Sequence, residues 1–231
     1  LNAGFKNFRD YKMEALGRFD YSVQDCYDFH TSVKSVIVPI AKRIQEERLA
    51  LLGKDKFKPW DLEVDPEGKK PLKPFNSGKE LLEGTIKMFN EIDPYFGDCI
   101  QTMDEMKHLD LESKNGKAPG GYNYPLYEIG VPFIFMNSVG SAHDLVTMVH
   151  EGGHAIHSFL SRNLALTGFK NLPSEVAELA SMSMELLSME KWNHFYTDED
   201  DFKRAKKEQL ESIIKILPWI AQVDEFQHWL Y

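Results

Sequence analysis

Two histidines and a glutamate in the second half of this sequence have the spacing of a metal site. His150, Glu151 and His154 form an H-E-x-x-H motif in a segment with helical character. On a helix, this spacing brings both imidazoles out of one face, where they can bind the same divalent cation with Glu151 beside it. A zinc ion there would activate a water molecule, and Glu151 would accept its proton and later deliver one to a departing amine. The motif therefore indicates zinc-dependent peptide hydrolysis.

The flanking residues predict the helix that carries the motif. Ser141 and Asp144 resemble a capping box, so we expect a helix start near Ala142. Gly152 and Gly153 would each cost about 1 kcal/mol relative to alanine, which another backbone or a substrate at close range would explain. The alternative is a loosely packed helix with two satisfied core histidines. The apolar residues share one stripe and the histidines an adjoining face: Leu145, Val146, Val149, Ile156, Phe159 and Leu160, then His150, His154 and His157.

A catalytic zinc site also needs a third protein ligand and an open position for water. After a short polar connection, residues 172–187 predict a second helix, antiparallel to the first, with Pro173 and Ser174 at its start. Glu175, Glu178 and Glu185 could project from it toward the histidines. The spacing does not choose among these three carboxylates, and any of them could be a solvated helix acid.

Four segments together resemble the oligoendopeptidase F branch of the thimet oligopeptidase family of zinc metallopeptidases: residues 116–122, 132–137, 144–160 and 173–187. In that family the third ligand is the glutamate five residues after the proline of a Pro-Ser-[Gln/Glu]-x-x-Glu segment, which corresponds to Glu178. The resemblance thus implies one zinc ion bound by His150, His154 and Glu178, with Glu151 as the general base.

Further polar residues are candidates for supporting the metal ligands. Ser181 and Glu185 follow Glu178 on the same helical face, and Glu175 precedes it by three residues. One or more of them could accept the remaining ring N–H of a liganding histidine, although packing or solvated roles are the alternative. We expect His157 to support or pack beside the site rather than bind the metal.

Substrate contacts are expected on a short strand just before the histidine helix. Residues 131–137 form an apolar, partly aromatic run that predicts such a strand. A free edge there would bind an extended peptide through backbone hydrogen bonds, with Phe133, Phe135 and Asn137 as candidate contacts. The alternative is an interior strand without a free edge. The glycine-containing loop 113–124 lacks the pattern of a nucleotide phosphate loop.

The expected fold class is mainly α, a zincin-like helical metallopeptidase catalytic domain with a small β-sheet beside the active-site helix. We expect residues 1–231 to form a single catalytic-region fragment, and the resemblance implies additional N-terminal and C-terminal regions in a full-length member. The parts are a helical lobe at 1–53, an irregular strand-bearing connection at 54–76 and a helical zinc-binding core at 77–231. Further helices are predicted at 5–17, 22–52 with a bend at Pro39, 77–92, 94–107, and from a cap at Thr197 to Tyr231 with an interruption near Pro218; strands are predicted near 60–64, at 109–112 and at 131–137.

Composition narrows the possible partners and location. The 231 residues are 42% hydrophobic and 27% charged, with a formal net charge of -9, which argues against a nucleic-acid partner. No apolar run approaches the length of a membrane span, and the N-terminus lacks a secretory pattern, so the expected location is cytoplasmic and no membrane partner is expected. Cys26 and Cys99 are isolated and are most simply buried thiols. The oligomeric state is not predicted.

Three functions are compatible with these patterns. The favoured one is a zinc metalloendopeptidase that hydrolyses internal bonds of short oligopeptides. A zinc carboxypeptidase of similar helical build would need a basic group for the terminal carboxylate, and the sequence identifies none. A non-catalytic metal-binding helical domain is the third, but a structural zinc would not require the base Glu151.

Overall fold

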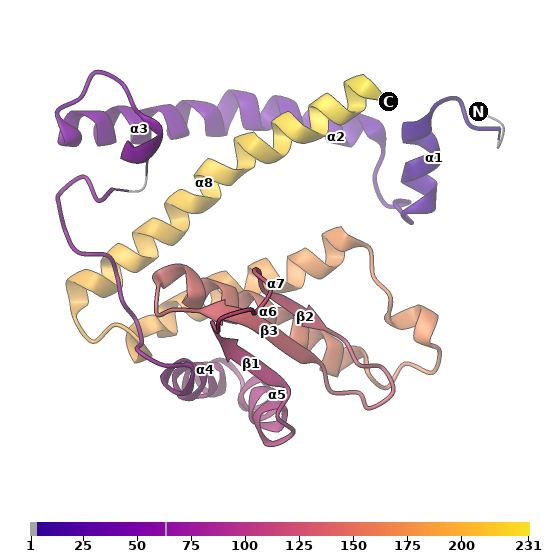
Figure 1. Cartoon of the computed structure of the whole chain (residues 1–231). Coiled ribbons are helices and arrows are strands. Elements are labelled where there is room, and N and C mark those ends of the chain that lie inside the picture. The colour runs from indigo at the N-terminus through magenta and orange to yellow at the C-terminus, as the bar shows by residue number, and fades with distance from the viewer. Residues whose placement is uncertain (1–3, 63) are drawn as a thin grey trace. The chain divides into compact units, whose positions relative to one another are not determined.

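The computed structural model describes residues 4–62 and 64–231, and the chain folds as two compact units, Leu1–Pro71 with Lys207–Tyr231, and Leu72–Lys206. Most of its elements are helices, and the second unit contains a single small sheet (Figure 1), so the predicted mainly α fold class is confirmed. No helix in the described ranges is both long and apolar enough to cross a membrane.

The first unit contains α1 (Phe8–Ala15), α2 (Val23–Ser32), α3 (Val38–Leu52) and the C-terminal part of α8 (Glu199–Leu230). A π-helical turn, Val33–Ile37, joins α2 to α3, and in it the backbone N–H of Val38 donates to the carbonyl of Val33. The turn lies where the sequence predicts a bend, because Pro39 has no N–H to donate to the preceding turn and its ring crowds that turn.

The strand predicted near Trp60 is wrong. Pro59–Asp61 form a short 3₁₀ helix instead, and the described residues on either side of position 63 are bends. Residue 63 itself lies outside the described part. Asp61 closes this turn by accepting the backbone N–H of Lys58 at 2.8 Å. A hydrogen bond within the turn is thus formed where a strand would need backbone hydrogen bonds to a neighbouring strand.

The second unit contains α4 (Gly78–Ile92), α5 (Pro94–Glu105), α6 (Ala142–Ser161), α7 (Ser174–Ser188) and the first residues of α8. Two 3₁₀ helices, Thr167–Lys170 and Met189–His194, precede and follow α7. Local capping explains the starts of the first three helices. Ser77 and Asp93 cap α4 and α5, and at α6 the capping box of Ser141 and Asp144 is formed as predicted.

The sheet of this unit has the order β1-β3-β2, with β1 at Leu109–Glu112, β2 at Tyr122–Tyr124 and β3 at Phe133–Ser138. β3 pairs with β1 in parallel and with β2 antiparallel. The prediction of a free edge along residues 131–137 is therefore wrong, because β3 is paired on both sides. Among the described residues, β1 and β2 are the edge strands of the sheet, and the sequence did not predict β2.

The core of the second unit lies between the sheet and the helices α4, α5 and α6. Alternate residues of β3 face it, since Ile134 and Met136 are buried while Phe133 and Phe135 are only partly covered. The fully buried side chains include Leu81, Met88, Phe89, Ile100, Met103, Leu145, Met148, Val149 and Trp192. Burial of this apolar stripe holds α6 against the sheet.

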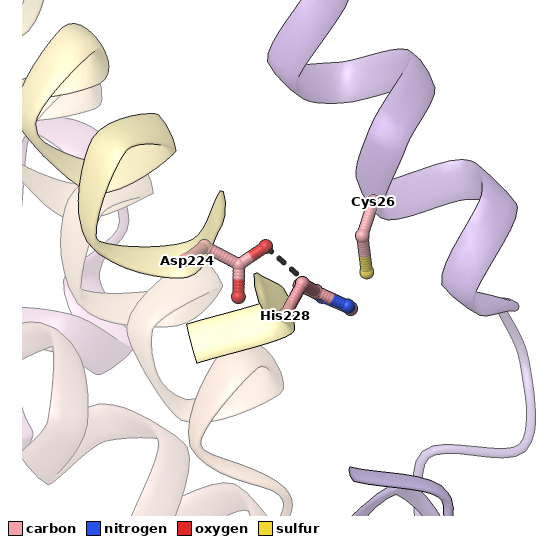
Figure 2. Close-up of side chains that lie close together, drawn as sticks. All are labelled: Cys26, Asp224 and His228. Atoms are coloured by element: carbon pink, nitrogen blue, oxygen red, sulfur yellow. Dashed lines mark ion pairs between the residues drawn. The ribbon is translucent and has the colours of Figure 1, made fainter. Parts of the chain in front are cut away.

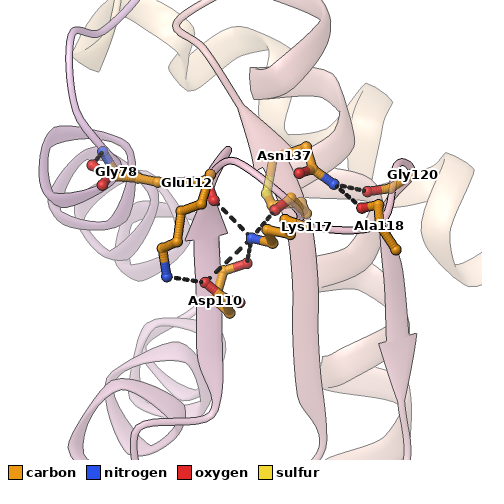
Figure 3. A network of polar contacts seen from close by, with 9 residues as sticks. Gly78, Asp110, Glu112, Lys117, Ala118, Gly120 and Asn137 are labelled. Atoms are coloured by element: carbon orange, nitrogen blue, oxygen red, sulfur yellow. Dashed lines mark hydrogen bonds and ion pairs between the residues drawn. The ribbon is translucent and has the colours of Figure 1, made fainter.

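A buried lysine anchors the loop between β1 and β2 (Figure 3). The ammonium of Lys117 donates to the carbonyls of Asp110 and Glu112 at 2.9 and 2.7 Å and to that of Met136 on β3. The side-chain amide of Asn137 donates to two carbonyls of the same loop, those of Ala118 and Gly120, at 2.8 and 2.9 Å. These contacts hold the loop as it crosses from β1 to the opposite side of β3, where β2 pairs.

Two expectations for the last helix are wrong. The cap of α8 is Asp198 rather than Thr197, because the Asp198 carboxylate accepts the N–H groups of Asp200 and Asp201, both at 3.0 Å. The helix also continues through Pro218 to Leu230 without interruption. A proline costs about 3 kcal/mol in a helix interior, and the remaining hydrogen bonds of this 32-residue helix keep it intact.

Candidate metal centre

The helices α6 and α7 bring the three predicted metal ligands together. His150 Nε2 lies 3.3 Å from Glu178 Oε2, and His154 Nε2 lies 3.8 Å from Glu178 Oε1. The two imidazole rings are nearly perpendicular, with centroids 4.9 Å apart. Of the three glutamates that spacing left open on α7, Glu178 is the one that faces both histidines.

This arrangement fits a tetrahedral metal ion. Zinc bonds of about 2.0–2.2 Å place neighbouring ligand atoms about 3.3–3.6 Å apart. The two nitrogen-to-oxygen distances are close to that range, and one ligand atom from each of the three residues lies within 4.8 Å of the others. Two imidazoles and one carboxylate also match the donor set of catalytic zinc sites, which leaves one position for water.

Gly153 explains how α7 can approach the motif. A Cβ atom added at Gly153 would lie 2.8 Å from the Cα of Ser181 and 3.0 Å from the carbonyl oxygen of Ala180. The expectation that a second backbone approaches this glycine is confirmed. A Cβ at Gly152 would instead lie 2.8 Å from the ring of Phe89. Both glycines are therefore required by packing around the site.

Glu185 contacts the side of His150 that faces away from Glu178. His150 Nδ1 lies 2.7 Å from Glu185 Oε1, and this hydrogen bond raises the pKa of His150 above its usual value. With Nδ1 engaged by a carboxylate, Nε2 is left to face the candidate metal position. Burial lowers the pKa of His154, which favours the neutral ring that binds metals.

The other three residues predicted to support the metal ligands lie at different places around the site: Ser181, His157 and Glu175. The buried Ser181 hydroxyl lies 3.1 Å from Glu178 Oε2 and 3.0 Å from the Glu178 backbone oxygen, so its proton can be donated to either. His157 is half-buried and close enough for its charge to lower the pKa of His154. Glu175 is exposed in the first turn of α7.

Glu151, which follows His150 on α6, is buried. The residue is 7% exposed, and burial raises the pKa of its carboxyl group. The backbone amide of Asn123 on β2 lowers the pKa of this carboxyl and so partly opposes the shift. A carboxylate with a raised pKa is suited to accepting a proton near neutral pH. The edge strand β2 is therefore next to the candidate base.

The predicted substrate-contact residues lie on one face of the central strand. The Phe135 ring stacks on that of Tyr122 at 5.0 Å, with the Lys117 ammonium 4.5 Å from its centroid. Asn137 holds the loop described above, and the Phe133 ring lies 6.1 Å from that of His108.

The exposed aromatic side chains of the edge strand β2 are Tyr122 and Tyr124, at 49% and 60% exposure. Sequence reasoning missed them, although the alternation in Tyr122-Asn123-Tyr124 is a weak strand signal.

A family model, two related proteins and one solved structure that match this chain are all peptidases. The family model of peptidase family M3 matches residues 1–231. The plasmid-encoded oligoendopeptidase F of Lactococcus lactis subsp. cremoris is 25% identical over 185 residues, covering 80% of this chain and 30% of that protein. The chromosomal oligoendopeptidase F of the same subspecies is 29% identical over 152 residues, covering 64% of this chain and 24% of that protein. The structure of PZ peptidase A with an inhibitor superposes with a TM-score of 0.90 at 33% identity, covering 100% of this chain and 40% of that one.

Proposed function

Because the chain belongs to peptidase family M3, we propose that it carries the active site of a zinc-dependent metalloendopeptidase that hydrolyses internal bonds of short oligopeptides. The observation that supports this most directly is the convergence of His150, His154 and Glu178 beside the buried carboxyl of Glu151. The chain spans less than a third of the length of the two oligoendopeptidases compared above, and the activity of the whole protein is part of the proposal.

His150, His154 and Glu178 would hold one catalytic zinc ion, with Glu185 and Ser181 orienting two of these ligands. When bound, the ion supplies Lewis acidity, which makes a water molecule more acidic and polarises the carbonyl of the scissile peptide bond. Glu185 keeps His150 in the tautomer with a free Nε2. Ser181 restrains one oxygen of Glu178.

Glu151 is the group that moves the proton. Its carboxylate accepts a proton from the attacking water and then gives it to the amine that leaves when the peptide bond breaks. The raised pKa brings the carboxyl closer to the pH at which both transfers must occur. The backbone amide of Asn123 favours the charged form of the carboxyl, which is the form that accepts the proton.

The strand that aligns the substrate peptide is β2 rather than β3. The outer side of β2 has no partner strand in the described part of the chain, and its central residue contacts the base. An extended peptide paired there would place its carbonyl groups near Glu151 without a demand for particular side chains. Tyr122 and Tyr124 would flank such a peptide, while Phe133, Phe135 and Asn137 would support the strand and loop behind it.

The substitution Glu151→Gln in the full-length protein tests the proposal. We expect zinc content to be retained, because the metal ligands are intact, and turnover of an internally quenched peptide to fall by about 10²–10⁴-fold. The exposed Glu128→Gln is the matched control and should leave turnover unchanged. Turnover near wild type in Glu151→Gln would refute the assigned base. Cleavage that requires a free C-terminus would indicate a carboxypeptidase, and zinc binding without any cleavage would indicate a non-catalytic domain.

A further inference from the structure

The first unit contains a second cluster of metal-binding side chains, which the proposed function does not use. One ligand atom from each of Cys26, Asp224 and His228 lies within 4.8 Å of the other two. Figure 2 shows Cys26 on α2 facing Asp224 and His228 on α8. The three residues supply a thiol, a carboxylate and an imidazole, which are the three side-chain types that bind zinc.

The periodicity of both helices creates this cluster. Asp224 and His228 are one turn apart on α8, and Cys26 and His30 are one turn apart on α2, so each helix presents two donors on one face. His30 Nε2 lies 2.7 Å from Asp224 Oδ2, and His228 Nε2 lies 3.4 Å from the same oxygen. The ring of Tyr27 covers the cluster, with its centroid 5.2 Å from that of His228.

Two buried ring nitrogens in this cluster have no partner. The side chains of His228 and His30 are 7% and 3% exposed, and neither Nδ1 atom has a hydrogen-bond partner among the described residues. A buried polar atom without a partner costs free energy, and a bound ion would remove that cost at one of them.

We propose that Cys26, Asp224 and His228 bind a zinc ion that clips α2 to the C-terminal end of α8. Thiolate, carboxylate and imidazole donors suit zinc better than the harder cations calcium and magnesium. Tetrahedral ligation needs these atoms about 3.3–3.6 Å apart, a closure that side-chain rotation on the two helices can supply. His30 donates to Asp224 and orients its carboxylate toward the ion.

The charges and exposure of the cluster are compatible with such an ion. A Cys26 thiolate and the Asp224 carboxylate together carry two negative charges, which balance the charge of a divalent cation. Cys26 is partly exposed, contrary to the expectation that both cysteines are buried, so an ion can reach its sulfur. The site is structural, and it does not depend on the proposed peptidase function.

Metal stoichiometry of the full-length protein tests this site. The protein is reduced, treated with a chelator and titrated with zinc alone in a His150→Ala, His154→Ala background, which removes the first site. We expect one equivalent of zinc in this background and none after Cys26→Ser or His228→Gln is added. Cys99→Ala is the matched cysteine control and should retain the equivalent. In otherwise wild-type protein, Cys26→Ser should lower the zinc stoichiometry by one equivalent.

Cobalt gives an independent readout, because a bound thiolate produces a charge-transfer absorption that nitrogen and oxygen ligands do not. We expect this band in the background variant and its loss in Cys26→Ser, with circular dichroism showing that both remain folded. No zinc uptake by the folded background variant would overturn the proposal. Zinc uptake that survives both Cys26→Ser and His228→Gln would also overturn it.

Discussion

The substitution Gly153→Ala should weaken zinc binding more than it weakens the fold. The added methyl group would lie 2.8 Å from the Cα of Ser181, whereas ordinary contacts of a Cβ atom begin at 3.4 Å. The obstacle is backbone, which cannot rotate away as a flexible side chain can. The helix α7 must therefore shift by several tenths of an ångström at Ser181, one turn from the proposed ligand Glu178.

The two effects of the methyl group on stability largely cancel. Overpacking costs about 1–3 kcal/mol, and replacement of a helical glycine by alanine returns about 1 kcal/mol. We expect the free energy of unfolding of the metal-free protein to fall by about 0–2 kcal/mol. Metal ligation tolerates only about 0.2 Å of error in ligand distance, so the shift should lower zinc affinity by about 10–100-fold, the range seen when the supports of metal ligands are disturbed.

Chelator competition gives the zinc affinity, and denaturant unfolding with a chelator present gives the stability. Gly168→Ala is the matched control, because no atom lies within 4 Å of its added methyl group, and both quantities should change little. If Gly153→Ala folds and binds zinc as tightly as wild type, the spacing of α6 and α7 does not control the site.

Three further predictions concern residues around the site and the core. Glu185→Gln should weaken zinc binding by about 10–100-fold in chelator competition, because His150 loses the carboxylate at its Nδ1. Lys117→Met should lower the free energy of unfolding by about 1–3 kcal/mol in a denaturant titration, because the carbonyl groups and the Asp110 carboxylate that the ammonium contacts lose their donor. Lys114→Met, which removes an exposed partner of the same carboxylate, should change it by about 0–1 kcal/mol. Burial raises the pKa of Cys99 to about 11, so its thiol stays protonated and native protein should resist alkylation at Cys99 until the pH rises toward that value, as peptide mapping would show.

Local signals in the sequence predicted most of the second unit. The starts of α4, α5 and α6 are set by side chains that cap the first turn within three residues, so neighbouring residues suffice to place them. The strand β1 has the predicted bounds, and Glu185 was among the candidates for supporting a histidine. The choice of Glu178 as the third ligand came from family resemblance, because helical spacing alone left three glutamates equivalent.

Long-range pairing is what local signals could not predict. The strand β2 has three residues and lies in a glycine-containing loop, so its assignment depends on pairing with β3. That pairing makes β3 central and moves the candidate peptide-binding edge to β2. The buried contacts of Lys117, which join β1 to β3, depend on the same pairing. For Cys26, the decisive neighbours lie near the other end of the chain.

Gly153 in the motif explains how the helix α7 can contact both nitrogens of His150. The contacts pair His150 with Glu185 and His154 with Glu178, so α6 and α7 run antiparallel. Glu178 and Glu185 are two turns apart on α7 and contact the two nitrogens of the same imidazole, Nε2 at 3.3 Å and Nδ1 at 2.7 Å. One helix can reach both nitrogens only if its backbone comes close to α6, which the missing side chain of Gly153 permits. Gly153 therefore destabilises α6 relative to alanine, but it allows the single neighbouring helix α7 to present both the ligand Glu178 and the supporting residue Glu185.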